Sequence, residues 1–287
     1  MNTQVAIALV LAAASATLVN LAYLREHDAA AELPALSMRR PLHSIGLLVG
    51  DRSWMLGFGM ESLGFVLYAV ALAFASLALV QSISAGGIGV LAFVSARMAR
   101  RPLSRRELAG VLLSVLGLIA LAVSLAGGRA TGGEGEIMSI LVWLGVTAVV
   151  AIAVVVLRGR LLGPAVAFGI AGGLFFSIGD IATKVTTEGG ARTGFVVLLL
   201  TGYGLGTACL QLGYQAGGAL TVAGIATLLT NALPIAAGTV VLDEPVPSGA
   251  LGVVRLFAFA AVVVGAVLLS RPQKHSATQN ATEPQPT

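Results

Sequence analysis

The chain has 287 residues, of which 57% are apolar and only 10% are charged, and its mean hydropathy is +0.94. Ordinary soluble domains contain roughly 45–50% apolar and about 25% charged residues. This chain lacks the polar surface of a water-soluble body, so its composition predicts an integral membrane protein. Its formal charge of +4 comes from short basic blocks between apolar runs, which indicates membrane topology and argues against a nucleic-acid partner.

Nine apolar stretches are long enough to cross a bilayer, because a spanning helix needs about 20 apolar residues. They cover residues 5–24, 54–75, 77–96, 108–126, 137–157, 162–183, 194–212, 220–242 and 251–269. The second and third are joined by almost no loop, since residues 54–96 carry Glu61 as their only charge. The sequence therefore predicts an all-α integral membrane protein with about nine transmembrane helices, and leaves eight or ten open.

The first stretch could instead be a signal peptide, because Ala14-Ser15-Ala16 resembles a cleavage site. However, the preceding residues MNTQ carry no basic side chain, and the apolar stretch continues past this point. We therefore interpret it as a membrane span.

The basic residues predict the orientation of the spans. With nine crossings, 13 Lys and Arg residues fall on one side and three on the other, while Arg255 lies within a span. The positive-inside rule then places the N-terminus outside and the C-terminus in the cytoplasm. We expect a multi-pass protein of the plasma membrane, which in a bacterium is the inner membrane.

Two regions share a layout at an offset of 143 residues. Residues 77–108 and 220–251 each contain an apolar span, a short charged turn with proline (Pro102 or Pro245) and the start of another span. The first turn is basic and the second acidic, so the two halves would insert in opposite senses. We expect a first repeat of four helices in residues 1–126, a linking helix in 127–161, a second repeat in 162–270 and a disordered cytoplasmic tail in 271–287. Such inverted repeats are typical of secondary transporters.

The sequence resembles the drug/metabolite transporter (DMT) superfamily, in its EamA-like form. The resemblance rests on Trp54, Gly57, Glu61, Leu79-Val80, the stretch RRELAG at 105–110, and the turn Glu244-Pro245. The nearest branch is that of the NIPA-type magnesium transporters, which also have nine spans. The chain departs from the family pattern at Gln81-Ser82, where a proline is common, and at Arg100-Arg101, in place of a glutamate. The resemblance implies a transporter with DMT-like inverted repeats and, in this branch, magnesium as its substrate.

Two carboxylates lie inside predicted spans, where an ionisable group costs roughly 2.5–3.5 kcal/mol and is usually functional. Glu61, in the second span, could carry charge, a proton or a metal ion, or be a neutral acid hydrogen-bonded to a neighbouring helix. Asp180, in the sixth span, could line the same path or form an ion pair with Lys184 at the outer rim. Asn20 occupies a position in the first span like that of Asp180 in the sixth. We expect Glu61 nearer the cytoplasm and Asp180 nearer the outside, as successive stations.

Further polar side chains in the spans complete the predicted path: Gln81, Asn231, Tyr203 and Tyr214. A partly hydrated Mg²⁺ needs one or two carboxylates with oxygen support, so Glu61 is the candidate metal ligand. An organic cation could use the same carboxylate, with Tyr203 and Tyr214 supplying cation–π contacts. The sequence leaves both substrates open.

We expect a secondary transporter that works by alternating access, with a divalent cation such as Mg²⁺ as the preferred substrate. An exporter of a small organic metabolite or drug cation is the alternative, and a non-transporting membrane scaffold is a third. The sequence shows no nucleophile–base pair, metal cluster or phosphate loop, and Cys209 is its only cysteine. We therefore expect no enzyme activity and no cofactor. The expected partners are the ion or small-molecule substrate and the lipid bilayer, and a homodimer is left open.

Overall fold

The computed structural model describes residues 3–75, 77–84, 87, 91–92, 94, 97, 104–125, 135–158, 160, 162–243 and 249–270. The turns at residues 100–102 and 244–248, on which the sequence repeat partly rests, and the predicted tail lie outside these ranges. All regular structure within them is helical.

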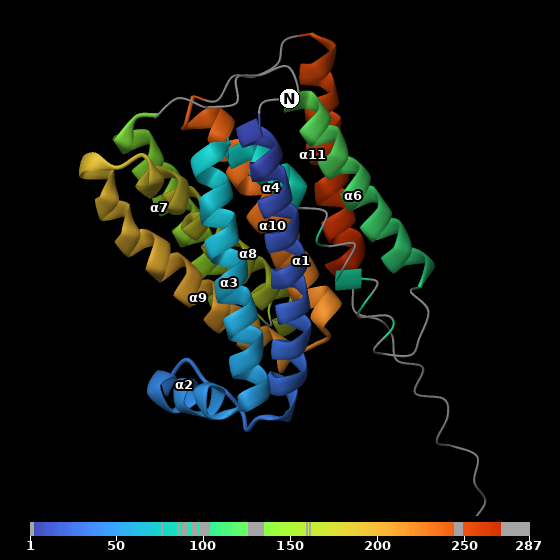
Figure 1. Cartoon of the computed structure of the whole chain (residues 1–287). Helices are drawn as coiled ribbons and strands as arrows, with labels where there is room; N and C mark the ends of the chain where they lie inside the picture. Colours follow the sequence, from blue (N-terminus) through green and yellow to red (C-terminus); the bar gives the residue numbers. More distant parts are fainter. Residues whose placement is uncertain are drawn as a thin grey trace, which may run out of the picture.

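The helices run roughly alongside one another as a bundle (Figure 1). Their bounds are α1 Thr3–Glu32, α2 Pro41–Gly50, α3 Arg52–Phe74, α4 Leu77–Ser84, α6 Arg105–Leu125, α7 Ile137–Val156, α8 Pro164–Thr187, η1 Gly190–Phe195 (a 3-10 helix), α9 Val196–Tyr214, α10 Ala219–Val240 and α11 Ala250–Ser270. Each of the nine predicted spans overlaps one of these helices, although only part of the third span is described. Six are long and apolar enough to cross a membrane: α1, α3, α7, α8, α9 with η1, and α10.

The first predicted span was too short. Residues 25–52 were expected to form a loop, but α1 continues to Glu32 and α2 follows it. The extra turns contain Ala29, Ala30 and Ala31, which are strong helix formers. Because the helix continues, Glu26 is carried into the bundle, and its exposed fraction is 0%.

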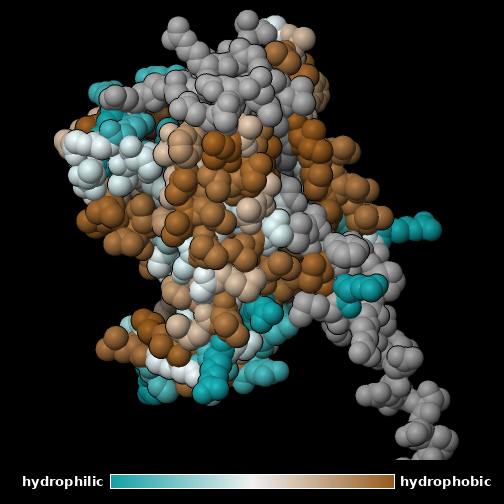
Figure 2. Space-filling model, in the orientation of Figure 1, coloured by the Kyte–Doolittle hydropathy of each residue, from teal (hydrophilic) through white to brown (hydrophobic). Residues whose placement is uncertain are grey.

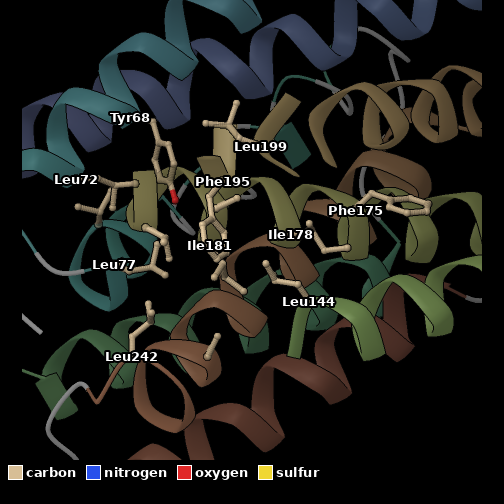
Figure 3. Packing of buried hydrophobic residues seen from close by; sticks show 14 of the residues in the cluster. Tyr68, Leu72, Leu77, Leu144, Phe175, Ile178, Ile181, Phe195, Leu199 and Leu242 are labelled. Atoms are coloured by element: carbon tan, nitrogen blue, oxygen red, sulfur yellow. The ribbon is translucent and has the colours of Figure 1, made fainter. Parts of the chain in front are cut away.

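The centre of the bundle is α8, of whose 24 residues 18 are buried. It packs against α7, α9 and α10, while α1 packs against α3, and α6 against α11. Apolar side chains from several helices meet around it, among them Tyr68 and Leu72 of α3, Leu144 of α7 and Ile181 of α8 (Figure 3). A polar residue in the middle of α8, such as Ser177 or Asp180, therefore lies in the interior.

Glycines allow α8 and α9 to approach closely. A methyl group on Gly202 would lie 2.7 Å from the Gly179 amide nitrogen and 2.8 Å from the Phe175 carbonyl oxygen. A methyl group on Gly206 would lie 2.6 Å from the Phe176 ring. The sequence spacing Gly202-x-x-x-Gly206 predicts such small-residue packing, and the two helices meet there.

The outer surface is apolar where a soluble protein would be polar. Large apolar side chains stand exposed along α3 and α7, including Leu63 at 55%, Val146 at 59% and Val149 at 66%. In Figure 2 apolar side chains cover the middle of the visible face, and hydrophilic ones gather toward its ends. The chain is a multi-pass membrane protein, and this apolar band faces lipid.

The segment between α1 and α3 lies at one end of the bundle. In Figure 1 α2 lies beside the lower end of α3 and runs crosswise to it. The Gln215 side chain accepts a hydrogen bond from the Leu36 amide (2.8 Å) and donates to the carbonyl oxygens of Ala30, Leu33 and Pro34. The segment is thus tied to the C-terminal end of α9.

Candidate functional site

A cavity of about 250 Å³ lies inside the bundle, between its two halves. Its walls come from α1, α3, α4, α8, α9 and α10. The lining residues are Ser15, Ala16, Val19, Asn20, Tyr23, Phe58, Glu61, Ser62, Phe65, Tyr68, Gln81, Ser84, Phe176, Asp180, Leu199, Leu200, Tyr203, Thr207, Thr227, Thr230 and Asn231. Among them are two carboxylates and no Lys, Arg or His.

The structure brings together six of the seven side chains predicted to form a path. Glu61, Asp180, Asn20, Gln81, Asn231 and Tyr203 all line this cavity. Tyr214 is not among the lining residues. It is 2% exposed, and its ring meets that of His27 edge-on at a centroid distance of 5.5 Å.

Asp180 is 6% exposed and is held by hydroxyl groups from two other helices. The Tyr203 hydroxyl of α9 donates to its Oδ1 at 2.5 Å, and the Thr230 hydroxyl of α10 donates to its Oδ2 at 2.6 Å. Gln81 Nε2 donates to the Tyr68 hydroxyl at 2.8 Å, and both side chains line the same cavity. Asp180 is therefore a buried acid with a built shell of donors.

The alternative role for Asp180, an ion pair with Lys184, does not occur. The ion pairs in the part of the chain that the structure describes include His27 with Asp28 and Arg192 with Glu188, and none joins Asp180 to Lys184. Because Asp180 faces α9 and α10, it turns toward the cavity and away from the rim.

Two amides of the cavity wall present oxygen atoms without hydrogen-bond partners. Asn20 donates its Nδ2 to the Ala16 carbonyl at 2.8 Å, and Asn231 donates its Nδ2 to the Thr227 carbonyl at 2.6 Å. These bonds leave both amide Oδ1 atoms, which are buried, free of hydrogen-bond partners in the described structure. Buried acceptors are normally satisfied, so atoms of this kind invite a donor, a water or a cation.

Glu61 reaches the same cavity from α3, and its Oε2 is buried without a hydrogen-bond partner. Carboxylate and amide oxygens are the ligands that hard cations prefer. Within the described residues, however, no group of three or more His, Cys, Asp and Glu side chains could hold a metal ion.

Sequence reasoning missed Glu26, which had been assigned to a loop. Its Oε2 accepts a hydrogen bond from Gln211 Nε2 at 2.6 Å, and its carboxyl group contacts that of Glu61. The sequence did carry a signal, because Tyr23, Glu26 and Ala30 follow one another at helical spacing along the buried face of α1.

The comparisons with known proteins give one relative. The chain is 25% identical over 261 residues to a protein of Arabidopsis thaliana named "Probable magnesium transporter NIPA9", and the match covers 83% of this chain and 74% of that protein. No protein-family model matches the chain, and no solved structure matches it. The relative is named as a transporter and not as an enzyme, which agrees with the absence of catalytic motifs from the sequence.

Proposed function

We propose that this protein is a secondary membrane transporter whose substrate is a divalent cation such as Mg²⁺. The observation that carries the proposal is the cavity itself, which holds two carboxylates and partner-free amide oxygens and has no basic side chain among its described lining residues. Such a lining attracts cations and repels anions. The relative named as a probable magnesium transporter supports the choice of ion.

Alternating access between two inverted repeats is the mechanism that we propose. The helix contacts support it, because they recur in matching pairs: α1 packs against α3 as α8 does against α9, and α4 packs against α6 as α10 does against α11. Contacts between α1 and α4 likewise correspond to those between α8 and α10.

Atomic contacts support the same correspondence. A methyl group on Gly64 of α3 would lie 3.3 Å from the Ser15 carbonyl oxygen and 3.5 Å from the Val19 amide nitrogen of α1. Gly202 of α9 has the same relation to Phe175 and Gly179 of α8, each 160 residues further along than its counterpart in α1.

The side chains that follow these contacts also correspond. Asn20 comes directly after Val19, and Asp180 directly after Gly179. Asn20 lies against Gly87, and Asp180 bonds to Thr230, which is 143 residues beyond Gly87. In the proposed inverted repeat, Asn20 of the first half thus corresponds to Asp180 of the second, and both line the cavity.

An organic cation is the second candidate substrate. Tyr23, Phe58, Phe65, Phe176 and Tyr203 contribute aromatic rings to the wall, and rings of this kind bind organic cations through their faces. In this case Asp180 or Glu61 would supply the counter-charge.

The test is growth at low magnesium of a bacterium that lacks its own uptake systems. The strain would express the protein, Glu61→Gln, Asp180→Asn or the control Glu32→Gln, whose residue is exposed on α1. We expect the protein and the control to restore growth and the two cavity variants to lower magnesium uptake at least about tenfold, since each loses a charge in a site that water barely screens. Membrane levels are matched by immunoblot.

Failure of the protein itself to restore growth, at normal membrane levels, would argue for the organic cation. Equal rescue by all variants would keep magnesium transport and remove both carboxylates from the path.

A further inference from the structure

Next to the cavity, a second group of buried polar atoms lies where α1, α3 and α9 meet. Glu26 is 0% exposed and Gln211 is 1% exposed. Gln211 Nε2 donates to Glu26 Oε2 at 2.6 Å, and the carboxyl groups of Glu26 and Glu61 contact each other. The two acids come from different helices, so the packing of α1 on α3 sets their contact. A methyl group on Gly57 of α3 would lie 2.7 Å from Glu26 Cγ, and the absence of a side chain there makes room for the glutamate.

This group is rich in acceptors and poor in donors. Glu26 Oε1, Glu61 Oε2 and Gln211 Oε1 are each buried and have no hydrogen-bond partner in the described part of the chain. Asp180 differs, because both of its oxygens receive hydroxyl donors. Three unsatisfied oxygens that belong to interacting side chains need something positive between them.

Within the described residues, no Lys or Arg forms an ion pair with Glu26 or Glu61. His27, the next residue on α1, contacts Asp28 and the edge of the Tyr214 ring, and Arg25 is exposed. Buried carboxylates need a counter-charge. A bound cation would supply it to this pair.

We propose that Glu26, Glu61 and Gln211 form a buried binding site for a divalent cation. This inference rests on the proposed function and adds a ligand set to it. The two carboxylates neutralise the ion, Gln211 Oε1 adds a neutral oxygen, and water completes the shell of an ion such as Mg²⁺.

Glu61 belongs to both the cavity and this site, whereas Glu26 is absent from the cavity lining. Glu61 is therefore placed to pass the ion from one to the other.

The experiment is calorimetric titration of the purified full-length protein with MgCl₂. We expect saturable binding. Glu26→Gln should weaken binding about tenfold or more, while Glu26→Asp keeps part of the affinity. The control Glu32→Gln, on the exposed end of the same helix, should bind like the unchanged protein.

Folding of each variant is checked by its melting temperature without magnesium, and Gln211→Leu probes the site without touching a carboxylate. Unchanged affinity in both Glu26→Gln and Gln211→Leu would overturn the site, as would absence of magnesium binding by the unchanged protein. Magnesium flux into liposomes separates the two proposals. Binding that depends on Glu26 without any flux supports the site and refutes transport, whereas flux with normal binding by Glu26→Gln supports transport and refutes the site.

Discussion

Asp180 is a buried acid whose hydrogen-bond donors all come from within the bundle in the described structure. Its two oxygens are satisfied by hydroxyl groups on α9 and α10, which belong to the chain and not to solvent. These hydroxyls can reorient when a cation arrives, because each oxygen both donates and accepts. In the transport that we propose, the Asp180 carboxylate exchanges these two hydroxyl donors for the ion.

Tyr203→Phe tests this arrangement. The ring contacts with Phe65 and Phe176, at centroid distances of 4.9 and 5.8 Å, stay in place, and only the donor to Asp180 is lost. A hydrogen bond to a charged group contributes roughly 1.5–3 kcal/mol. We expect magnesium flux into liposomes, measured at equal amounts of inserted protein, to fall about tenfold, and the melting temperature to fall by several degrees. The control is Thr201→Val, an exposed position of the same helix; flux that equals that of this control would exclude a role for the Tyr203 hydroxyl.

At this scale the sequence was informative, because polar residues within apolar spans are few and costly. That reasoning pointed to Asp180, Asn20 and Asn231, which now line one cavity. Whether they carry substrate stays a prediction. The sequence could not show that Tyr214 points elsewhere or that Glu26 meets Glu61, because both depend on the rotation of each helix about its axis.

Among the helices, the close approach of α8 and α9 depends on glycine. Gly202→Ala places a methyl group against backbone atoms of α8, which cannot move aside as a side chain could. Overpacking of this kind costs typically 1–3 kcal/mol.

We expect Gly202→Ala to lower the melting temperature of the purified protein by several degrees. Gly204→Ala is the matched control, because Gly204 is exposed and has no atom within 4 Å of the added methyl group. A Gly202→Ala protein as stable as this control would mean that the two helices can separate without loss.

Helix ends were the weakest part of the sequence prediction. Hydropathy ended the first span at residue 24, because charged residues follow there, yet α1 runs to Glu32. Hydropathy measures affinity for lipid, whereas the last turns of α1 face protein. α6 begins at Arg105, three residues before the predicted span of 108–126. Ser104 and Glu107 form a capping box there, in which each side chain accepts from the other's amide, at 3.2 and 2.8 Å.

For the whole molecule, the distribution of basic residues predicts that the C-terminus is cytoplasmic. We expect green fluorescent protein fused after residue 287 to fluoresce in bacteria, because it folds in the cytoplasm. Alkaline phosphatase fused after residue 243 should be active, because that turn is predicted to be external. The opposite pair of results would invert the topology, and activity of both reporters at both sites would point to mixed insertion.

The all-helical class and the membrane setting followed from composition alone, and the described structure agrees with both. The number of spans and the inverted repeat remain predictions, since part of the third span and the two compared turns lie outside the described residues. Composition indicates how much of a chain lies in lipid. The pairing of helices depends on the shapes of the side chains at their contacts, and the two halves share too few identical residues to show it.

The proposed correspondence of Asn20 with Asp180 has a consequence for direction. If the two halves exchange conformations, the framework is nearly the same in both states, but at this pair of positions one half carries an amide and the other a carboxylate. The two orientations of the empty carrier then differ in free energy, and the membrane voltage adds to that difference because Asp180 would sit at a different electrical depth in each. An empty carrier of this kind favours one orientation. Its binding site is then open mainly to one compartment, and it returns to that side after each substrate is released.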